Sequence, residues 1–204
     1  MDESIPALKS TQAAPSDIIR EKRYGCEVMD VIKKYGDILR RKADRKPETA
    51  LKMFRFGLGL EYQKATRLAD KALPLGYREV YRSAVKRTGE ILSDPAGSVW
   101  TNIFGPVEIF QCFDLNSTSM EMLSAFMSGF RTEDYFIDRA EDIGIASTLC
   151  SYHKHFIGTV ESGVMPSPAY IAVTSAVCDG NINTMRYAAA KRGMRFFAID
   201  VPHS

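Results

Sequence analysis

Two of the four cysteines occupy positions that suit metal or thiol chemistry. Cys178 follows the apolar run 171–174 and precedes a predicted helix, and Cys150 begins another predicted helix. Ser147 and Thr148 are possible caps of that second helix. A helix N-terminus stabilises a thiolate, so both sulfurs are candidates to bind one iron centre. Taken alone, their residue type still favours buried, unreactive thiols, because free cysteine is among the most buried residues.

His153 and His155 follow Cys150 closely, so a Cys/His metal site has to be considered. Residues 153 and 155 point to well-separated sides of a helix, because neighbours on one face are three or four residues apart. This spacing is poor for a zinc site. It favours histidines that lie at the surface or that hydrogen-bond to a metal ligand without binding the metal themselves. We expect Cys26 and Cys112 to pack in the core. The scattered cysteines argue against a disulfide framework.

Glu108 is a candidate catalytic residue. It follows Pro106 in the first turn of a predicted helix, directly after the predicted strand 99–104. A carboxylate at that position is stabilised by the helix dipole, so a structural role and a role in the site are both open. We expect Met120, Met122 and Met127 to fill the core. The chain carries no Ser-His-Asp order, Walker loop or HExxH motif.

The first half of the chain reads as helical. Residues 1–16 are polar and read as a loose tail, and residues 17–92 form a helical region. The predicted helices cover 17–46, 47–72 and 77–92, and Gly57 and Gly59 form the weak point of the second one. The turn-forming segment 93–98 then ends the helical pattern and marks a boundary.

The second half, residues 99–204, reads as an α/β domain. Predicted strands at 99–104, 170–174 and 196–201 alternate with helices, which implies a parallel sheet covered on both faces. The predicted helices are 106–113, 119–130, 133–143, 149–161 and 181–192. Ligands of such sheets bind beyond the carboxyl ends of the strands, here 175–179 and 200–204.

Composition limits the class of protein. The 204 residues are 45% hydrophobic with a mean hydropathy of -0.18, and no apolar run is long enough for a membrane span. The N-terminus lacks the pattern of a secretory signal, so we expect a cytoplasmic protein. Residues 1–100 hold 20 Lys and Arg against 14 Asp and Glu, and residues 101–204 hold 7 against 11. The basic charges are spread through the helical pattern, which favours solvated helices over nucleic-acid binding.

Four segments together resemble the 2-hydroxyacyl-CoA dehydratase family, which includes benzoyl-CoA reductase subunits. They are residues 99–110 (VWTNIFGPVEIF), 148–151 (TLCS), 177–180 (VCDG) and 197–202 (FAIDVP), and the resemblance runs from about Tyr77 onward. It implies a flavodoxin-like, three-layer domain in which Cys150 and Cys178 hold a [4Fe-4S] cluster. Family members usually supply a third cysteine from a second α/β half. The sequence holds no such half, so the resemblance implies either a truncated piece or a degenerate member.

The resemblance also implies a reaction and its partners. An ATP-dependent iron-sulfur activator protein would supply one electron, and the dehydratase would use it to form a ketyl radical from the thioester of an acyl-CoA substrate. The radical expels the neighbouring hydroxyl, which is a lyase reaction, and Glu108 would orient the substrate or move a proton. A related second dehydratase subunit completes the enzyme. The alternatives are a benzoyl-CoA reductase-like subunit, a truncated noncatalytic partner protein, and zinc binding by Cys150 with His153 or His155.

Overall fold

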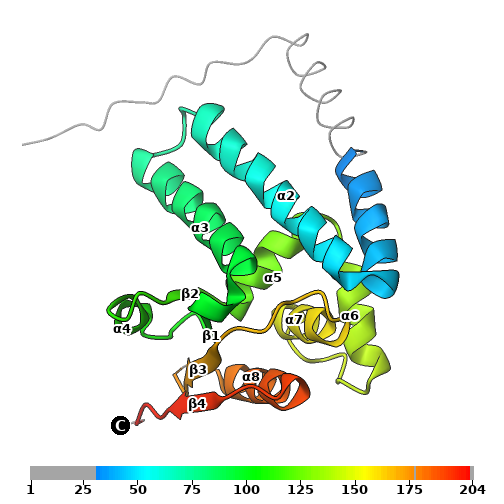
Figure 1. Ribbon diagram of the computed structural model, residues 1–204, viewed down its shortest axis with the longest axis vertical. Coiled ribbons are helices and arrows are strands. Elements are labelled where there is room, and N and C mark those ends of the chain that lie inside the picture. Colours follow the sequence, from blue (N-terminus) through cyan, green and yellow to red (C-terminus); the bar gives the residue numbers. More distant parts are fainter. Residues whose placement is uncertain (1–30, 177, 203–204) are drawn as a thin grey trace, which may run out of the picture.

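The computed structural model describes residues 31–176 and 178–202, and its first part is helical. A helix over residues 31–45 precedes α2 (Pro47–Arg67) and α3 (Leu75–Ser93), which form a helical hairpin (Figure 1). Pro47 ends the first helix and begins the second, as expected from its fixed backbone angle. The predicted tail 1–16, the helix start at 17–30 and Cys26 lie outside the described residues.

The expected weak point does not interrupt α2. Gly57 and Gly59 lie inside one unbroken helix, which ends at Arg67 instead of residue 72. A Cβ atom at Gly57 would lie 2.4 Å from Cε1 of Phe130. The glycine therefore admits an aromatic ring against the helix, and that contact offsets its low helix propensity.

Four strands form one parallel sheet in the order β2-β1-β3-β4. The strands are β1 (Ser98–Thr101), β2 (Asn116–Ser119), β3 (Tyr170–Thr174) and β4 (Phe196–Ile199). This order matches the first four strands of the flavodoxin-like arrangement, which confirms the predicted α/β fold class. The sequence analysis missed β2, because its residues Asn-Ser-Thr-Ser carry no apolar pattern.

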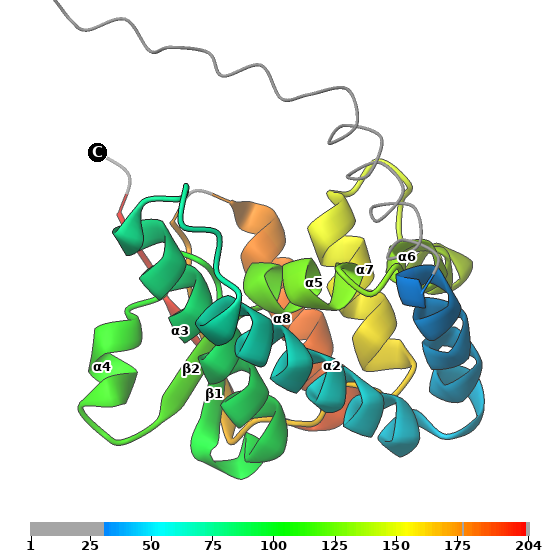
Figure 2. The same cartoon turned by 90° about the horizontal axis from the view of Figure 1, so that it is seen from above.

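Helices cover both faces of the sheet (Figure 2). The helices of this region are α4 (Val107–Gln111), α5 (Met120–Ser128), α6 (Glu133–Asp142), α7 (Ser151–Glu161) and α8 (Asp179–Arg192), of which α6 packs on α7 instead of on the sheet. On one face, Phe110 of α4 packs with Val99 and Ala172. On the other face, Phe156 of α7 meets Trp100 with ring centroids 5.2 Å apart. These layers are the ones expected for a sheet whose strands alternate with helices.

One apolar core joins the helical region to the sheet. A single cluster of buried side chains contains Leu39 from the first helix, Phe54 from α2, Val85 from α3, and Trp100 and Val173 from the strands. The expected boundary at 93–98 is a turn with a short 3-10 helix, Pro95–Gly97, but the apolar core continues across it.

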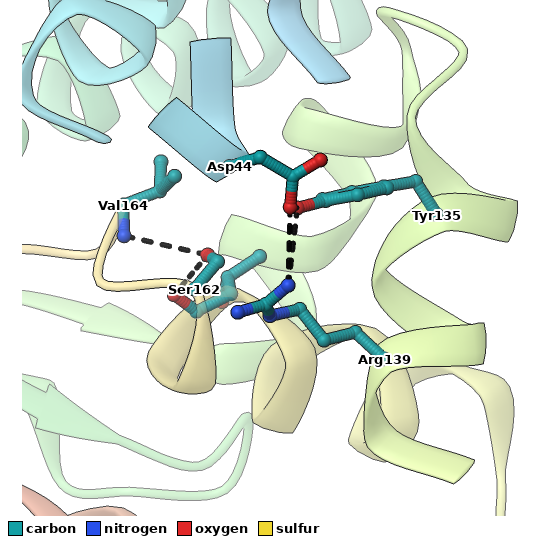
Figure 3. Close-up of polar contacts among 6 residues, drawn as sticks. Asp44, Tyr135, Arg139, Ser162 and Val164 are labelled. Atoms are coloured by element: carbon teal, nitrogen blue, oxygen red, sulfur yellow. Dashed lines mark hydrogen bonds and ion pairs between the residues drawn. The ribbon is translucent and has the colours of Figure 1, made fainter. Parts of the chain in front are cut away.

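Polar contacts also hold the first helix against α6 (Figure 3). Asp44 accepts hydrogen bonds from the hydroxyl of Tyr135 at 2.6 Å and from Nη1 of Arg139 at 3.1 Å. Burial, followed by the hydrogen bond to Asp44, raises the pKa of Tyr135 to about 12, so this phenol keeps its proton at neutral pH. Nearby, Ser162 is the C-cap residue of α7, and its hydroxyl accepts a hydrogen bond from the Val164 amide.

Two expectations about packing are wrong. Cys112 is exposed after the short helix α4, where we expected a core residue, and Met122 is 38% exposed. Met120 and Met127 are buried as predicted. Met122 differs because it follows Met120 by two residues, a spacing that turns it away from the face of α5 that carries Met120 and Met127.

Candidate functional site

The carboxyl ends of β1 and β3 are tied together by one buried side chain. Asn102, directly after β1, accepts a hydrogen bond from the Thr174 amide at 3.1 Å and donates one to the Thr174 carbonyl at 3.2 Å. Both residues are buried. Asn102 thus continues the ladder between the two strands after β1 has ended, and it fixes the start of the segment that leads to Cys178.

Cys178 is the N-cap residue of α8, so its predicted place near a helix N-terminus is confirmed, although the helix begins at Asp179 instead of Asn181. Its side chain is half-buried and caps no backbone amide. The backbone turns sharply here, because the Cys178 amide donates to the carbonyl of Ala176 and the Asn181 amide donates to the carbonyl of Cys178. The sulfur lies at the positive end of the α8 dipole, which stabilises negative charge.

Cys150 occupies the same position on α7. It is itself the N-cap residue, so the expected capping by Ser147 or Thr148 is wrong, and its side chain caps no amide. Cys150 is exposed. The interpretation of this cysteine as a buried thiol is therefore wrong, and its sulfur is accessible at a second helix N-terminus.

A buried lysine holds the loop that precedes Cys150. Nζ of Lys154 donates to Glu141 Oε1 at 2.6 Å and to the Ser147 carbonyl at 2.8 Å, and the lysine is 6% exposed. Glu141 is in α6, so this contact fastens the α6–α7 loop to both of its helices. On the other side, Ser124 of α5 donates to the carbonyl of Tyr152 at 3.1 Å.

His153 connects the two cysteine-bearing helices. Its Nε2 atom lies 3.8 Å from Sγ of Cys178, and its Nδ1 atom lies 2.8 Å from Oγ1 of Thr184 in α8. His153 is 4% exposed, so a surface location is wrong. Cys150 and His153 are the N-cap and third residues of α7, and these two positions lie on one face of a helix start. Cys150 and Cys178 therefore begin helices that meet at one corner, which we call the α7–α8 corner.

The environment of His153 favours its neutral form. Burial lowers the pKa of His153 from its ordinary value, and the carboxylate of Glu121 opposes this shift. Gly180 adds to the crowding, because a Cβ there would lie 3.2 Å from Nε2 of His153 and 3.3 Å from Sγ of Cys178. The imidazole is thus confined between the sulfur, the threonine hydroxyl and the start of α8.

His155 lies apart from this corner. It is 2% exposed, so the expectation of a surface residue is wrong for it too. Neither ring nitrogen has a hydrogen-bond partner within the described residues, and its ring packs edge-on against Phe136. Burial lowers the pKa of His155 to about 4. It therefore behaves as a neutral core residue at neutral pH.

Glu108 is not brought to the α7–α8 corner by any contact among the described residues. It is exposed on α4, which packs on the opposite face of the sheet from α7 and α8. Cys112 lies at the C-terminal end of the same short helix. The role of Glu108 in the site stays a prediction.

A cavity of about 810 Å³ lies beside the corner. It is lined by the hairpin α2–α3, by α5 and by Tyr152 in the first turn of α7, it is open to solvent on one side, and it reaches Ser119 at the carboxyl end of β2. Most of its lining is apolar. Its polar side chains are Glu61, Lys64, Tyr81, Ser119, Glu121 and Tyr152. A large, mainly apolar cavity with a few polar groups is the usual form of a small-molecule site.

Glu121 connects this cavity to the corner. It lies in the first turn of α5, its Oε2 atom is buried with no hydrogen-bond partner in the described part of the chain, and its charge acts on His153. A buried carboxylate oxygen without a partner is costly, so this oxygen is available to accept a hydrogen bond from a ligand.

The donor set suits iron only in part. Thiolates are the usual ligands of iron-sulfur clusters, and two of them begin the helices of this corner. Within residues 31–176 and 178–202, however, no group of three or more Cys, His, Asp or Glu side chains could hold a metal ion. A cluster at this corner would therefore need ligands beyond Cys150 and Cys178.

The sequence analysis missed Glu121 and Thr184 and underestimated His153. His153 follows Cys150 by three residues, a spacing that puts both on one side of a helix start. The sequence analysis considered only the spacing between His153 and His155, so it did not use this relation. The approach of Thr184 to His153 depends on the packing of α7 against α8, which no local pattern reveals.

Comparison with known families identifies the family of the chain. The family model of the 2-hydroxyglutaryl-CoA dehydratase D-component matches residues 102–204, and the chain belongs to this family. The match begins after β1, later than the expected start near Tyr77. No curated protein matches the chain. Among the described helices, none is both long and apolar enough to span a bilayer.

Proposed function

We propose that the chain is an iron-sulfur subunit of a 2-hydroxyacyl-CoA dehydratase. The observation that carries the proposal is the 3.8 Å approach of Cys178 Sγ to His153, in the helix turn that begins at Cys150. It puts two cysteines at adjoining helix N-termini in a member of a dehydratase family. Thiolates at such positions are stabilised by the helix dipoles and suit a cluster.

Cys150 and Cys178 would supply two ligands of a [4Fe-4S] cluster. The remaining ligands would come from protein outside the described residues, either from this chain or from a related second subunit. The exposure of Cys150 supports a cluster shared with another segment, because a sulfur at the surface can bind a cluster whose other ligands come from that segment.

The cluster, when bound, supplies one-electron transfer at low potential. The electron would come from an ATP-dependent iron-sulfur activator protein and would reduce the thioester carbonyl of a 2-hydroxyacyl-CoA to a ketyl radical. The ketyl radical would expel the neighbouring hydroxyl, and loss of a proton from the next carbon would complete the elimination of water. Loss of water leaves the substrate at the same overall oxidation level, so the electron must be returned after elimination.

The chain's own residues would bind the substrate and handle the proton. The cavity beside the corner has the apolar lining to hold an acyl chain and exclude water, and Glu121 faces both the cavity and His153. A departing hydroxyl needs a proton, and a carboxyl group can supply it. Glu121 and Glu108 are the two candidates for that role, and Glu121 is favoured by its place in the cavity lining.

A second candidate is a noncatalytic partner of such an enzyme. It is favoured by the two-cysteine donor set, which alone does not complete a cluster. A benzoyl-CoA reductase-like subunit would share the cluster and the thioester substrate, and it differs from the first candidate only in the fate of the reduced thioester.

Anaerobic purification of the full chain from its own cells, with an affinity tag, tests the proposal. We expect a brown protein with iron and sulfide and the electron paramagnetic resonance signal of a reduced [4Fe-4S] cluster. Cys150→Ser and Cys178→Ser should each lose most of the iron. Cys112→Ser is the matched control, because this exposed cysteine lies on the other side of the sheet, and it should keep the iron.

A colourless wild-type protein that stays free of iron after reconstitution would overturn the cluster assignment and favour the noncatalytic partner. Equal iron loss in all three variants would instead reject the assignment of Cys150 and Cys178 as the ligands.

A further inference from the structure

The polar groups that line the cavity of about 810 Å³ form two sets. The first set lies on the helical hairpin, with Glu61 and Lys64 on α2 and Tyr81 on α3. The Glu61 carboxylate accepts a hydrogen bond from the Tyr81 hydroxyl at 2.9 Å and lies 3.5 Å from Nζ of Lys64. Of the described residues in the lining, Lys64 is the only cation. A ligand carboxylate here would meet a lysine that is already paired with a glutamate.

The second set lies near the α7–α8 corner and carries a negative charge without a cation. It consists of Ser119 at the end of β2, Glu121 in α5 and Tyr152 in α7. Oε2 of Glu121 is buried and has no hydrogen-bond partner in the part of the chain that the structure describes. The two hydroxyls are neutral, so they can bind a carbonyl oxygen but cannot balance the charge of a second carboxylate. The charge of a buried oxygen is screened much less than a charge on the surface.

The remaining lining of the cavity is apolar. It includes Leu58 of α2, Ile103 in the loop after β1, Met122 and Phe126 of α5, and Phe130 after α5. Such a lining favours an alkyl or aromatic group, because apolar surface is removed from water on both sides of the contact. It gives no hydrogen bond to a carboxylate, which is costly to take out of water without a partner.

We propose that this cavity selects an acyl group with an uncharged end and rejects one that ends in a carboxylate. The inference rests on the proposed function, in which the cavity holds the acyl group of a 2-hydroxyacyl-CoA. A distal carboxylate would lose water, would meet only the paired Lys64, and would be repelled by Glu121. An alkyl or aryl end avoids these costs and covers apolar side chains. Repulsion of the wrong ligand is a common source of specificity.

Calorimetric titration of the full, anaerobically purified chain with three thioesters tests the inference without electron transfer. The ligands are 2-hydroxyglutaryl-CoA and two analogues in which a primary amide or an isopropyl group replaces the distal carboxylate. The amide keeps the shape and the polarity of that end and removes its charge. We expect both analogues to bind about tenfold more tightly than 2-hydroxyglutaryl-CoA, because like charges brought together disfavour binding.

Glu121→Gln removes the charge and keeps the size of the side chain. It should bring the affinity for 2-hydroxyglutaryl-CoA close to that for the amide analogue. Glu133→Gln is the matched control. Glu133 also lies in the first turn of a helix, and its Oε2 is also buried with no hydrogen-bond partner among the described residues, but it is not part of the cavity lining. This variant should keep the wild-type order of affinities. If Glu121→Gln fails to fold, the order of the three thioesters in the wild-type protein decides the question.

Equal affinities of the three thioesters for the wild-type protein would overturn the inference. An amide analogue that binds as weakly as the carboxylate would overturn it too, because polarity instead of charge would then be responsible. An unchanged order in Glu121→Gln, or the same change in Glu133→Gln, would reject Glu121 as the source of the selection. Each of these results leaves the proposed function in place.

Failure of the proposed function would have a different signature. If none of the three thioesters bound, or if Ala125→Phe in the cavity lining weakened none of them, the cavity would not be the acyl site. That outcome would overturn the proposed use of the cavity, and the selection inferred from its lining with it.

Discussion

Gly158 of α7 lies against the backbone of Phe136 in α6 with no room for a side chain. A Cβ atom at Gly158 would lie 1.9 Å from the carbonyl oxygen of Phe136. The two helices pack closely along their length, and the glycine permits their closest approach. The first turn of α7 carries the candidate site, so this contact sets how α7 sits in the fold.

Gly158→Ala should therefore destabilise the protein, although alanine is the better helix former. Forcing the helices apart should lower the free energy of unfolding by about 2 kcal/mol, measured by urea denaturation. Gly59→Ala in α2 is the control, because nothing lies within 4 Å of a Cβ there. It should stabilise the protein by roughly 0.5 kcal/mol. Equal effects of the two changes would show that the α6–α7 contact is not tight.

His155 should make the protein sensitive to acid. Its pKa is about 4 in the folded chain and 6.5 in the unfolded chain, so protons bind preferentially to the unfolded state. Above pH 6.5 His155 is neutral in both the folded and the unfolded chain, and the full free energy of unfolding is retained. As the pH falls from 6.5 toward 4, only the unfolded chain binds a proton at His155, so the free energy of unfolding decreases. The loss should approach about 3 kcal/mol, because each unit of difference in pKa corresponds to about 1.4 kcal/mol.

His155→Phe should flatten this pH dependence while leaving stability at pH 7 unchanged or raised, because two unpaired buried nitrogens are removed. Urea denaturation of both proteins at pH 7 and pH 4.5 measures the difference. The same loss of stability in wild type and variant would assign the acid sensitivity to other groups.

Lys154→Met should loosen the loop that leads to Cys150. The change removes the hydrogen bonds to Glu141 and to the Ser147 carbonyl while keeping most of the apolar stem. We expect faster amide hydrogen exchange over residues 143–150 and a loss of about 2 kcal/mol in the free energy of unfolding. Lys191→Met removes a more exposed pair with Glu161 and should cost less than about 1 kcal/mol. Unchanged exchange in the loop would contradict the role of Lys154.

Ala125→Phe should obstruct the cavity beside the corner. Ala125 is exposed and belongs to the cavity lining. If the cavity receives the acyl group, the larger side chain should weaken binding of a 2-hydroxyacyl-CoA about tenfold, which corresponds to about 1.4 kcal/mol. Calorimetric titration measures this without electron transfer. Ala190→Phe, at an exposed position on α8 outside the cavity, should leave binding unchanged. Unaltered affinity in Ala125→Phe would place the acyl group elsewhere.

Much of the α/β region was predictable because its strands and helices differ in local pattern. The limits of β3 were predicted correctly from an apolar run bounded by polar residues. β2 was missed because Ser117, Thr118 and Ser119 are buried without being apolar. Their burial is imposed by the neighbouring strand β1 and by α3, α4 and α5, which local sequence does not reveal.

The candidate site was predictable in its residue types and not in its contacts. Helix N-termini at Cys150 and Cys178 follow from sequence, since helix starts have recognisable patterns. Only Cys178 follows a strand, because Cys150 comes after the α6–α7 loop. The burial of His153 and His155 does not, because α7 is enclosed on almost every side and loses the usual polar face. The bonds from Lys154 to α6 and from His153 to α8 depend on tertiary packing in the same way.

The apolar core shared by the hairpin and the sheet bears on how the chain unfolds. Because Leu39, Phe54 and Val85 lie in the same cluster as Trp100 and Val173, the two regions share their main hydrophobic interior, and the sheet region adds only the small cluster around Phe110. Residues 31–202 should therefore melt as one cooperative unit. Cleavage within the turn at 94–97 would leave two fragments with exposed apolar faces, and neither would keep α7 and α8 in register.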